Sequence, residues 1–299
     1  MLYSISRLKR GDRIQGRWSG VCYEIERKLG EGANGSVYLV RSPVGPSPCA
    51  LKIGSDLYGF QTEMNTMRDL SGFVSIYLAD DWQVGTACYP FYTMPFVDGA
   101  PMDRYARSVG TRELLECGEK LLQLLQLLHL HGWAFGDLKS GNVLASAGGK
   151  PQLVDFGGSA PFGSSIKQYS ELYDRGYWKA GGRTAEATYD LFSFAVLMIE
   201  SAGGERLLKE TANRAEARNE RGLLAVAGSC AALRPVSACI SKMIRGEYAG
   251  SDEALAEWRL ALSGYTGSAP GTADPRWLRL WLSGSAAAFA ASLCWMVLK

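Results

Sequence analysis

A glycine-rich segment near the start of the sequence places the strongest constraint on the fold. Residues 29–37 read LGEGANGSV, in which Gly30, Gly32 and Gly35 form the pattern GxGxxG and Val37 comes two residues later. The segment lies between two runs of β-forming residues, whereas a dinucleotide-binding fold would place it between a strand and a helix. We therefore expect a glycine-rich loop over nucleotide phosphates, because side chains would keep the backbone amides away from the phosphate oxygens.

Runs of β-forming residues alternate with turn signals through the first third of the chain and predict an antiparallel sheet. These runs are residues 23–29, 36–40, 49–53 and 88–96. One helix is expected among them, at residues 61–70. From Thr111 onward leucines recur at helical spacing, and further helices are expected at residues 189–200 and 236–262. The pattern predicts an α+β protein with a β-rich N-terminal part and a helical C-terminal part.

The composition argues against several other classes of protein. A hydrophobic content of 47% is enough for a sizeable core, and a net charge of +2 gives no general attraction to nucleic acid. The 7 cysteines are scattered and never spaced as CxxC, which argues against a disulfide framework and against a zinc site. His129 and His131 are the only histidines, and we expect them to pack or form local hydrogen bonds at a helix end.

One lysine stands inside an apolar strand. Residues 49–53 read CALKI, so the strand would carry Lys52 into the interior. A buried ammonium group needs an anionic partner, and Glu63 on the following helix is the candidate. In phosphoryl-transfer enzymes such a lysine also contacts the α- and β-phosphates of the nucleotide. The alternative is a lysine on an edge strand whose side chain reaches solvent.

A cluster of polar residues follows the leucine-rich helix. Residues 135–142 read FGDLKSGN, and the triplet DFG begins at Asp155, 13 residues after Asn142. Phosphoryl transfer needs groups of these kinds. Asp137 would orient the attacking hydroxyl, and Lys139 would offset the charge of the transferred phosphate. Asn142 and Asp155 would hold a magnesium ion, which prefers oxygen ligands.

Taken in this order, these elements resemble the Hanks-type serine/threonine protein kinases of bacteria, and the resemblance covers residues 23–262. Three stretches are similar to the tail-anchored YabT-type kinases of spore-forming Firmicutes: 132–139 (GWAFGDLK), 173–178 (YDRGYW) and 189–192 (YDLF). The resemblance implies the bilobal protein kinase fold, with a small β-rich N-lobe and a larger helical C-lobe. It also implies ATP and Mg²⁺ as cofactors, transfer of the ATP γ-phosphoryl group to serine or threonine of proteins, and a link to sporulation.

The same resemblance assigns residues 92–97 (YTMPFV) to the strand and hinge against which adenine lies. Met94 is then the gatekeeper, Pro95 offers adenine its carbonyl group, which proline retains, and Val97 supplies the amide donor. Asp190 begins the helix that supports the catalytic loop. The implied ATP-binding residues are Gly30, Gly32, Gly35, Val37, Lys52, Glu63, Pro95 and Val97.

Two departures from the family pattern concern activation and peptide docking. Phe135-Gly136-Asp137 replaces the usual His-Arg-Asp, so the arginine that pairs with a phosphorylated activation loop is absent. We therefore predict that autophosphorylation of the loop serines is not the on-switch by that route. These serines are Ser159, Ser164, Ser165 and Ser170. The usual Ala-Pro-Glu end of the loop is unrecognisable in residues 178–182, so peptide docking is expected to differ.

Two rival functions stay open on the sequence alone. The first is a phosphotransferase for a small metabolite, because Gly136-Asp137 also resembles the His-Gly-Asp loop of such enzymes. The second is a pseudokinase scaffold without catalysis. Protein substrates are favoured by Lys139, the triplet DFG that begins at Asp155 and the segment around Asp190. Catalysis is favoured by the joint presence of Lys52, Glu63, Asp137, Asn142 and Asp155.

The C-terminal end predicts one transmembrane helix. Residues 280–298 contain no charged residue, and as a helix they would span nearly the ~30 Å hydrocarbon core of a bilayer. Trp277, Trp281 and Trp295 lie near the two ends, where indole rings favour the membrane interface. Small residues inside the stretch would permit close helix pairing and thus a homodimer. The alternative is a buried C-terminal helix.

These patterns divide the chain into a kinase domain, a linker and a membrane helix. The kinase domain is expected at residues 1–263, with an N-lobe at about 1–97 and a C-lobe at about 98–263. The linker follows at 264–276 and the transmembrane helix at 277–299. The N-terminus lacks the apolar core of a signal peptide, so the catalytic domain is expected in the cytosol, at the cytoplasmic membrane.

A basic run near the N-terminus is interpreted as a solvated surface, with anionic lipid or nucleic acid as the alternative partner. The run consists of Arg7, Lys9, Arg10, Arg13 and Arg17.

Overall fold

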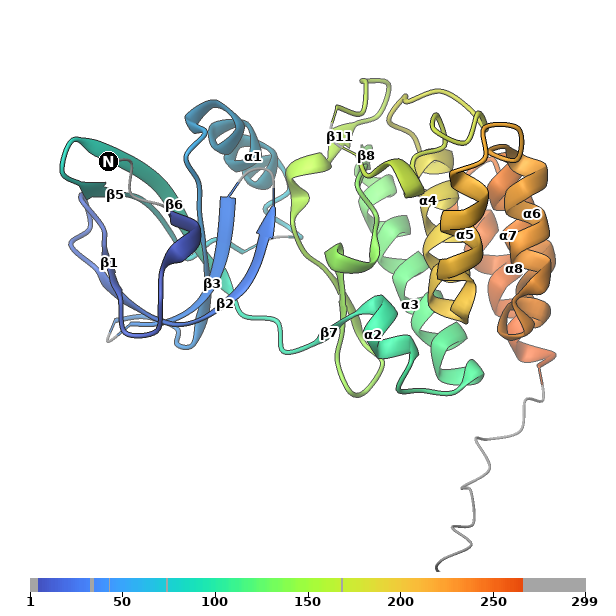
Figure 1. Ribbon diagram of the computed structural model, residues 1–299, viewed down its shortest axis with the longest axis horizontal. Helices are drawn as coiled ribbons and strands as arrows, with labels where there is room; N and C mark the ends of the chain where they lie inside the picture. Colours follow the sequence, from blue (N-terminus) through green and yellow to red (C-terminus); the bar gives the residue numbers. More distant parts are fainter. Residues whose placement is uncertain (1–4, 33–34, 43, 74, 168, 266–299) are drawn as a thin grey trace, which may run out of the picture.

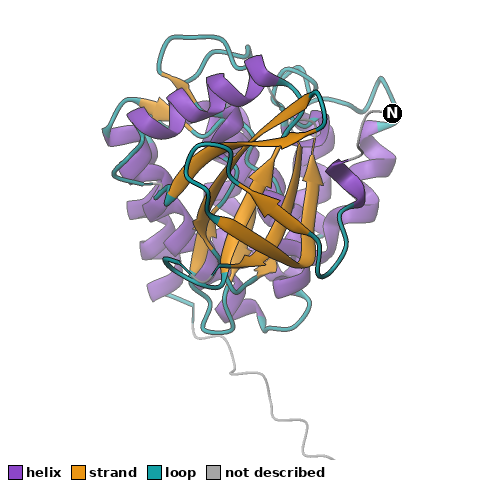
Figure 2. Cartoon of the chain, turned by 90° about the vertical axis from the view of Figure 1, so that its left-hand side faces the viewer, coloured by secondary structure: helices purple, strands orange, loops and turns teal. Residues whose placement is uncertain are grey.

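The computed structural model describes residues 5–32, 35–42, 44–73, 75–167 and 169–265. A β-sheet accompanied by one helix lies beside a larger helical part, and the chain crosses from one to the other after strand β6 (Figure 1). Seen from the sheet, the strands lie in front of the helices (Figure 2). This mixed content of sheet and helix agrees with the predicted α+β class.

The sheet has six strands in the order β1-β2-β3-β4-β6-β5, and neighbouring strands are antiparallel. The strands are β1 (Arg13–Gln15), β2 (Cys22–Gly32), β3 (Gly35–Arg41), β4 (Cys49–Ile53), β5 (Leu78–Val84) and β6 (Ala87–Pro95). Strand β4 lies inside the sheet and all of its residues are buried. Tyr38, Leu51 and Phe91 belong to a hydrophobic core formed largely by the strands. Strand β5 was not predicted, because its polar residues give no clear β pattern.

Helix α1 (Leu57–Asp69) begins earlier than the predicted residues 61–70. The reason is a capping residue: the side chain of Asp56 accepts a hydrogen bond from the backbone N–H of Tyr58 at 3.1 Å. The buried residues of the helix are Phe60, Glu63 and Met67, at helical spacing on one face. The helix therefore turns the carboxylate of Glu63 to the interior.

The helical part contains seven α-helices among the described residues. They are α2 (Met102–Ala106), α3 (Thr111–Leu130), α4 (Ala187–Ile199), α5 (Glu205–Ala212), α6 (Glu220–Ser229), α7 (Ser237–Arg245) and α8 (Ser251–Ser263). Residues 189–199 of α4 are all buried, which is typical of a helix at the centre of a core. The single helix predicted at 236–262 is wrong: α7 ends at Arg245, because the left-handed backbone of Gly246 (φ 66°) stops it, and α8 starts at Ser251.

Short strands at the edge of the helical part position the polar residues of the site. Strand β9 (Val143–Ala145) pairs with β7 (Ala100–Pro101) and with β10 (Pro151–Leu153). Strand β8 (Trp133–Ala134) pairs with β11 (Ala160–Pro161). These pairs fix residues 135–142, the predicted catalytic loop, and the segment that follows β10 against each other.

Within the described residues, no single helix has both the length and the apolar content needed to cross a bilayer. Residues 266–299 lie outside the described residues. They hold the predicted transmembrane helix and most of the predicted linker, so both stay predictions. Ala33 and Asn34 of the glycine-rich segment also lie outside.

Candidate active site

Lys52 connects the two parts of the protein at the centre of the candidate site. Its side chain comes from β4 and is buried, with 4% of the residue exposed, so the alternative of an edge-strand lysine in solvent is wrong. The Lys52 Nζ donates to Glu63 Oε1 at 2.6 Å and to Asp155 Oδ1 at 3.0 Å. Glu63 lies on α1, and Asp155 follows β10 in the helical part. Lys52 therefore links the sheet and α1 to the helical part.

The charges of these groups support one another. Burial alone would lower the pKa of Lys52, but the carboxylates of Asp155 and Glu63 outweigh it and raise the pKa. Partial desolvation would raise the pKa of Asp155, but the Lys52 ammonium group outweighs it and lowers the pKa. Burial dominates at Glu63 and raises its pKa, although Lys52 acts in the opposite direction. The lysine is therefore held in its charged form.

A short hairpin places the two predicted metal ligands side by side. In the β9–β10 pair, Val143 lies opposite Leu153. One residue further along each strand, the Val154 N–H donates to the Asn142 carbonyl at 2.9 Å. Asp155 follows directly and has a left-handed backbone (φ 64°, ψ 78°), which is rare for a residue with a side chain. The hairpin therefore brings Asn142 and Asp155 to the same end of the strand pair.

The residues present fit a magnesium ion held together with nucleotide phosphates. The described residues contain no group of three or more His, Cys, Asp or Glu that could hold a metal by themselves. Magnesium at nucleotide sites needs only one or two protein oxygens, and phosphates complete its shell. Asn142 Nδ2 donates to the Asp137 carbonyl at 2.9 Å and to Asp137 Oδ2 at 3.2 Å, which leaves the amide oxygen as ligand. The side chain of Asp155 is 45% exposed and offers its carboxylate.

The catalytic loop is anchored on helix α4 by Asp190, which is fully buried. The carboxylate of Asp190 accepts hydrogen bonds from the backbone N–H groups of Phe135 at 2.6 Å and Gly136 at 2.9 Å. His129 Nε2, near the end of α3, lies 2.9 Å from the same carboxylate, so this histidine joins α3 to α4, whereas a local hydrogen bond was expected. The buried carboxylate thus fixes the backbone just before Asp137.

Asp137 is held by its neighbours on one side only. Lys139 Nζ donates to Asp137 Oδ2 at 2.5 Å and to Ser170 Oγ at 3.1 Å. The other oxygen, Asp137 Oδ1, is buried and has no hydrogen-bond partner among the described residues. A buried acceptor without a partner costs free energy unless a ligand supplies the donor. A substrate hydroxyl group would supply it.

Gly136 stands where the family pattern has arginine, and the structure gives a steric reason. Its backbone has φ +81°, and a Cβ atom here would lie 2.2 Å from the carbonyl oxygen of Gly158. The backbone of the activation segment, which is the stretch between Asp155 and α4, therefore fills the space beside the catalytic loop that a side chain would need. Only glycine fits at this position.

The end of the activation segment is held by a buried carboxylate that the sequence did not reveal. Asp174 is fully buried and accepts hydrogen bonds from Arg183 Nη2 at 2.6 Å and from the Tyr189 hydroxyl at 3.0 Å. Arg175, also buried, donates to Glu186. These contacts tie residues 173–186 to the start of α4, in the region where the usual Ala-Pro-Glu end is missing.

The predicted nucleotide-binding residues lie on the sheet and on its connection to the helical part. Gly30 and Gly32 end β2, and Gly35 and Val37 begin β3. Gly35 has φ +142°, and a Cβ atom there would lie 2.2 Å from the Ile53 carbonyl oxygen, so glycine is required. Pro95 is the last residue of β6, and Val97 follows it in the connection to β7. Their contact with adenine stays a prediction.

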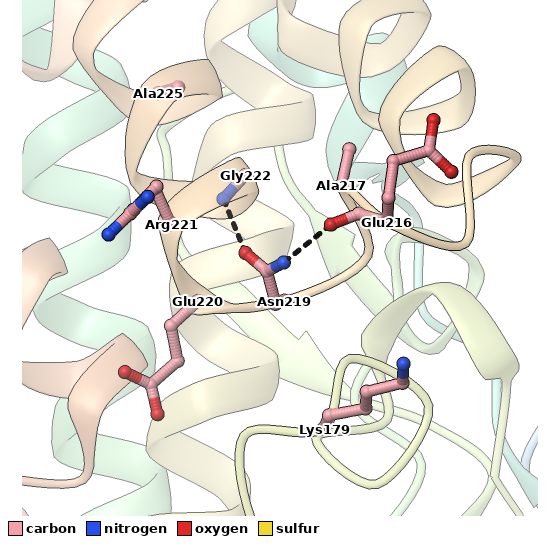
Figure 3. Close-up of a pocket in the computed structure, with 8 residues that line it drawn as sticks. All are labelled: Lys179, Glu216, Ala217, Asn219, Glu220, Arg221, Gly222 and Ala225. Atoms are coloured by element: carbon pink, nitrogen blue, oxygen red, sulfur yellow. Dashed lines mark hydrogen bonds between the residues drawn. The ribbon is translucent and has the colours of Figure 1, made fainter.

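A cavity of about 580 Å³ lies elsewhere, between α6 and the end of the activation segment (Figure 3). It is lined by Lys179, Glu216, Ala217, Asn219, Glu220, Arg221, Gly222 and Ala225. Asn219 caps the start of α6, and its side chain already has partners: it accepts a hydrogen bond from the Gly222 N–H and donates one to the Glu216 carbonyl (Figure 3). None of the predicted site residues lines this cavity.

The fold and the site define a protein kinase. Residues 23–245 match the protein kinase domain family, and the chain belongs to this family. It is similar to the serine/threonine-protein kinase YabT of Bacillus subtilis (strain 168), with 33% identity over 257 residues, 82% of this chain and 73% of that protein. The resemblance to bacterial Hanks-type kinases of the YabT type is thereby confirmed, and the protein is a serine/threonine protein kinase.

Two further relatives match over a smaller share of their own length. The DNA damage-responsive serine/threonine-protein kinase RqkA of Deinococcus radiodurans is 30% identical over 145 residues, 45% of this chain and 22% of that protein. The probable serine/threonine-protein kinase PknB of Lactococcus lactis is 24% identical over 200 residues, 61% of this chain and 32% of that protein. The chain therefore spans less than a third of the length of each of these two relatives.

Proposed function

We propose that this kinase transfers the γ-phosphoryl group of ATP, held with Mg²⁺, to serine or threonine hydroxyl groups of proteins. The bridge formed by Lys52 is the observation that carries the proposal. Kinase catalysis needs the strand lysine paired with the helix glutamate, and the DFG aspartate placed at the metal. Lys52 contacts both carboxylates here, and this arrangement supports a catalytic role for the three residues.

Each residue has a separate task in this proposal. Bound magnesium–ATP would supply the phosphoryl group and positive charge beside it. Lys52 would contact the α- and β-phosphates, and Asn142 and Asp155 would hold the metal ion. The free Oδ1 of Asp137 would accept the hydrogen bond of the substrate hydroxyl and orient it, while Lys139 would offset charge on the transferred group.

The test is incorporation of radiolabelled γ-phosphate into protein by wild type, Asp137→Asn and Lys52→Ala. We expect each substitution to lower kcat by about 10²-fold or more, because general-base and electrostatic contributions have this size. Lys242→Ala is the matched control. Lys242 is also a paired lysine, with Nζ 2.7 Å from Glu257 Oε2, but it lies on α7 away from the site. This variant should keep wild-type activity.

The same assay separates the proposal from its rivals. Family membership and the names of the relatives support protein substrates. Label found in a small metabolite and not in protein would support the metabolite phosphotransferase. No incorporation by wild type at all would support the scaffold and would contradict the proposed function.

We further propose that the kinase works at the cytoplasmic face of the membrane, held by a helix at residues 277–299. The uncharged stretch 280–298 and the tryptophans at its ends support this location. Pairing of two such helices into a homodimer and a link to sporulation stay predictions. The described basic residues of the N-terminal run are exposed, and their contact with anionic lipid or nucleic acid stays a prediction as well.

A further inference from the structure

A tyrosine on strand β6 reaches the same carboxylate as the catalytic lysine. Tyr92 is fully buried, and its hydroxyl donates to Glu63 Oε1 at 2.8 Å. Lys52 Nζ donates to this oxygen at 2.6 Å. In the pairing of β4 with β6, Lys52 and Tyr92 are direct cross-strand partners, so their side chains lie on one face of the sheet. Two neighbouring strands thus present two donors to one oxygen of α1.

Tyr92 contacts helix α1 at a second point. Its ring lies against that of Phe60, with ring centroids 5.3 Å apart. Phe60 and Glu63 are three residues apart, so they lie on the same face of α1, and both are buried. The aromatic contact and the hydroxyl bond therefore hold one turn of the helix against the sheet, at the residue on which the Lys52 ion pair depends.

The carboxylate of Glu63 needs this second donor. Burial raises its pKa, and Lys52 and the Tyr92 hydroxyl both act against that rise, so they favour the charged form. Glu63 Oε2 is buried and has no hydrogen-bond partner among the described residues. Both donors that the described residues offer to this carboxylate therefore meet at Oε1, and removal of one leaves a buried charge with a single partner.

We propose that Tyr92 is a positioning residue that holds α1 inward through its hydroxyl bond to Glu63, so that Lys52 faces the nucleotide phosphates. The proposal rests on the ATP-dependent kinase function proposed above. Tyr92 would also provide a contact that positions α1, which the catalytic loop cannot provide through a phosphate. Gly136 leaves no arginine there to receive a loop phosphate, and Tyr92 fixes the helix with a contact that is part of the fold.

The protein contains a matched control for this arrangement. On α8, Glu257 Oε2 accepts hydrogen bonds from Lys242 Nζ at 2.7 Å and from the Tyr248 hydroxyl at 2.9 Å. This is the same set of groups, a lysine and a tyrosine on one carboxylate oxygen, far from the candidate site in the sequence and outside it in the fold. Tyr248 is buried like Tyr92. Tyr248→Phe therefore removes an equivalent hydroxyl without touching α1.

The test compares Tyr92→Phe with Tyr248→Phe in the full chain. We expect Tyr92→Phe to lower kcat about tenfold, the size expected for a lost hydrogen bond to a charged group, with the KM for ATP changed less than threefold. Hydrogen–deuterium exchange of the α1 amides should speed up in this variant. Tyr248→Phe should stay within twofold of wild type in kcat and show wild-type exchange on α1.

A double-mutant cycle separates positioning from a general loss of stability. On a Glu63→Ala background, Tyr92→Phe should change kcat less than twofold, because the bond is already absent. Unchanged kcat in Tyr92→Phe, unchanged exchange of the α1 amides, or the same tenfold loss on the Glu63→Ala background would each overturn the proposal. An inactive wild type would instead contradict the proposed function, and the exchange measurement would still test the role of Tyr92.

Discussion

At the scale of single residues, Gly136 shows how a departure from a family pattern can be forced by the backbone around it. A Cβ atom would lie 2.2 Å from the Gly158 carbonyl oxygen, and φ is +81°. A side chain would therefore meet backbone that cannot turn aside. The absence of the arginine at position 136 therefore goes together with the path of the activation segment, whose backbone occupies the space that the arginine would need.

Restoring the arginine should damage the protein and should not restore control by phosphate. We expect Gly136→Arg to lower the free energy of unfolding by about 3 kcal/mol or more and the Tm by roughly 6–12 °C. Gly141→Ala is the control in the same loop, since no atom lies within 4 Å of its added Cβ. Thermal unfolding of the two variants decides the matter. A Gly136→Arg protein with the wild-type Tm would contradict this prediction, because it would show that the activation segment can move aside at little cost in free energy.

The sequence predicted residues whose chemistry is set by their local motif, and it missed residues that act through long-range contacts. Lys52, Glu63 and Asp155 could be named from their motifs, and the structure brings them within hydrogen-bond distance. Tyr92 was assigned only to the strand before the hinge. Its partner is known only once the register of β4 and β6 is known. Asp174 was missed for the same reason, because its partners Arg183 and Tyr189 lie 9 and 15 residues away and no local motif links them to it.

At the scale of elements, the activation segment is held by bonds to the helical part. Asp174 accepts hydrogen bonds from Arg183 and Tyr189, and strand β11 pairs with β8. Of the loop serines, Ser159 is buried and its hydroxyl donates to the Phe135 carbonyl at 3.2 Å, so it is not exposed to a second enzyme. Ser170 Oγ accepts a hydrogen bond from Lys139, so a phosphate on Ser170 would disturb a residue that is proposed to be catalytic.

The remaining loop serines test whether phosphate switches the enzyme on. We expect the double variant Ser164→Ala, Ser165→Ala to keep at least half of the wild-type kcat, because the residue before Asp137 is glycine and not an arginine that could pair with a phosphate. Phosphatase-treated wild type is the control and should behave in the same way. A fall to background activity in the double variant would refute this prediction.

The prediction of elements succeeded where periodicity was strong and failed where one residue ended an element. The leucines of α3 recur over a helix of 20 residues, and this helix was predicted from Thr111. The break between α7 and α8 was missed, because Gly246 and Gly250 were counted within one long helical pattern. A left-handed glycine ends a helix whatever the periodicity around it.

At the scale of the whole molecule, the sheet and the helical part meet at charged side chains. Lys52 reaches across to Asp155, and its other partner, Glu63, is supplied by α1. The ammonium group of Lys52 therefore adds an ionic contact to an apolar one, since Phe60 and Met67 of α1 share a hydrophobic core with Phe156 and the helical part. Sequence patterns predicted the two parts separately, but they could not predict this contact.

The proposed location can be tested on the whole chain. We expect the full-length protein to float with lipid vesicles and to resist extraction by about 1 M salt. At that concentration the Debye length falls to about 3 Å, so a protein held only by surface charge would be released. A variant that ends at residue 263 should stay in the soluble fraction and keep kinase activity. A full-length protein recovered in the soluble fraction would contradict the membrane proposal and leave the kinase assignment intact.

The bonds to Glu63 also bear on how inhibitors would bind. A compound that enters between α1 and the sheet must displace Lys52 and Tyr92 from one oxygen and leave a buried carboxylate without partners, which costs several kcal/mol. A compound that occupies only the predicted adenine site, next to the connection after Pro95, leaves both bonds in place. Inhibitors of this enzyme are therefore expected to be compact ligands of the predicted adenine site and not ligands that push α1 outward.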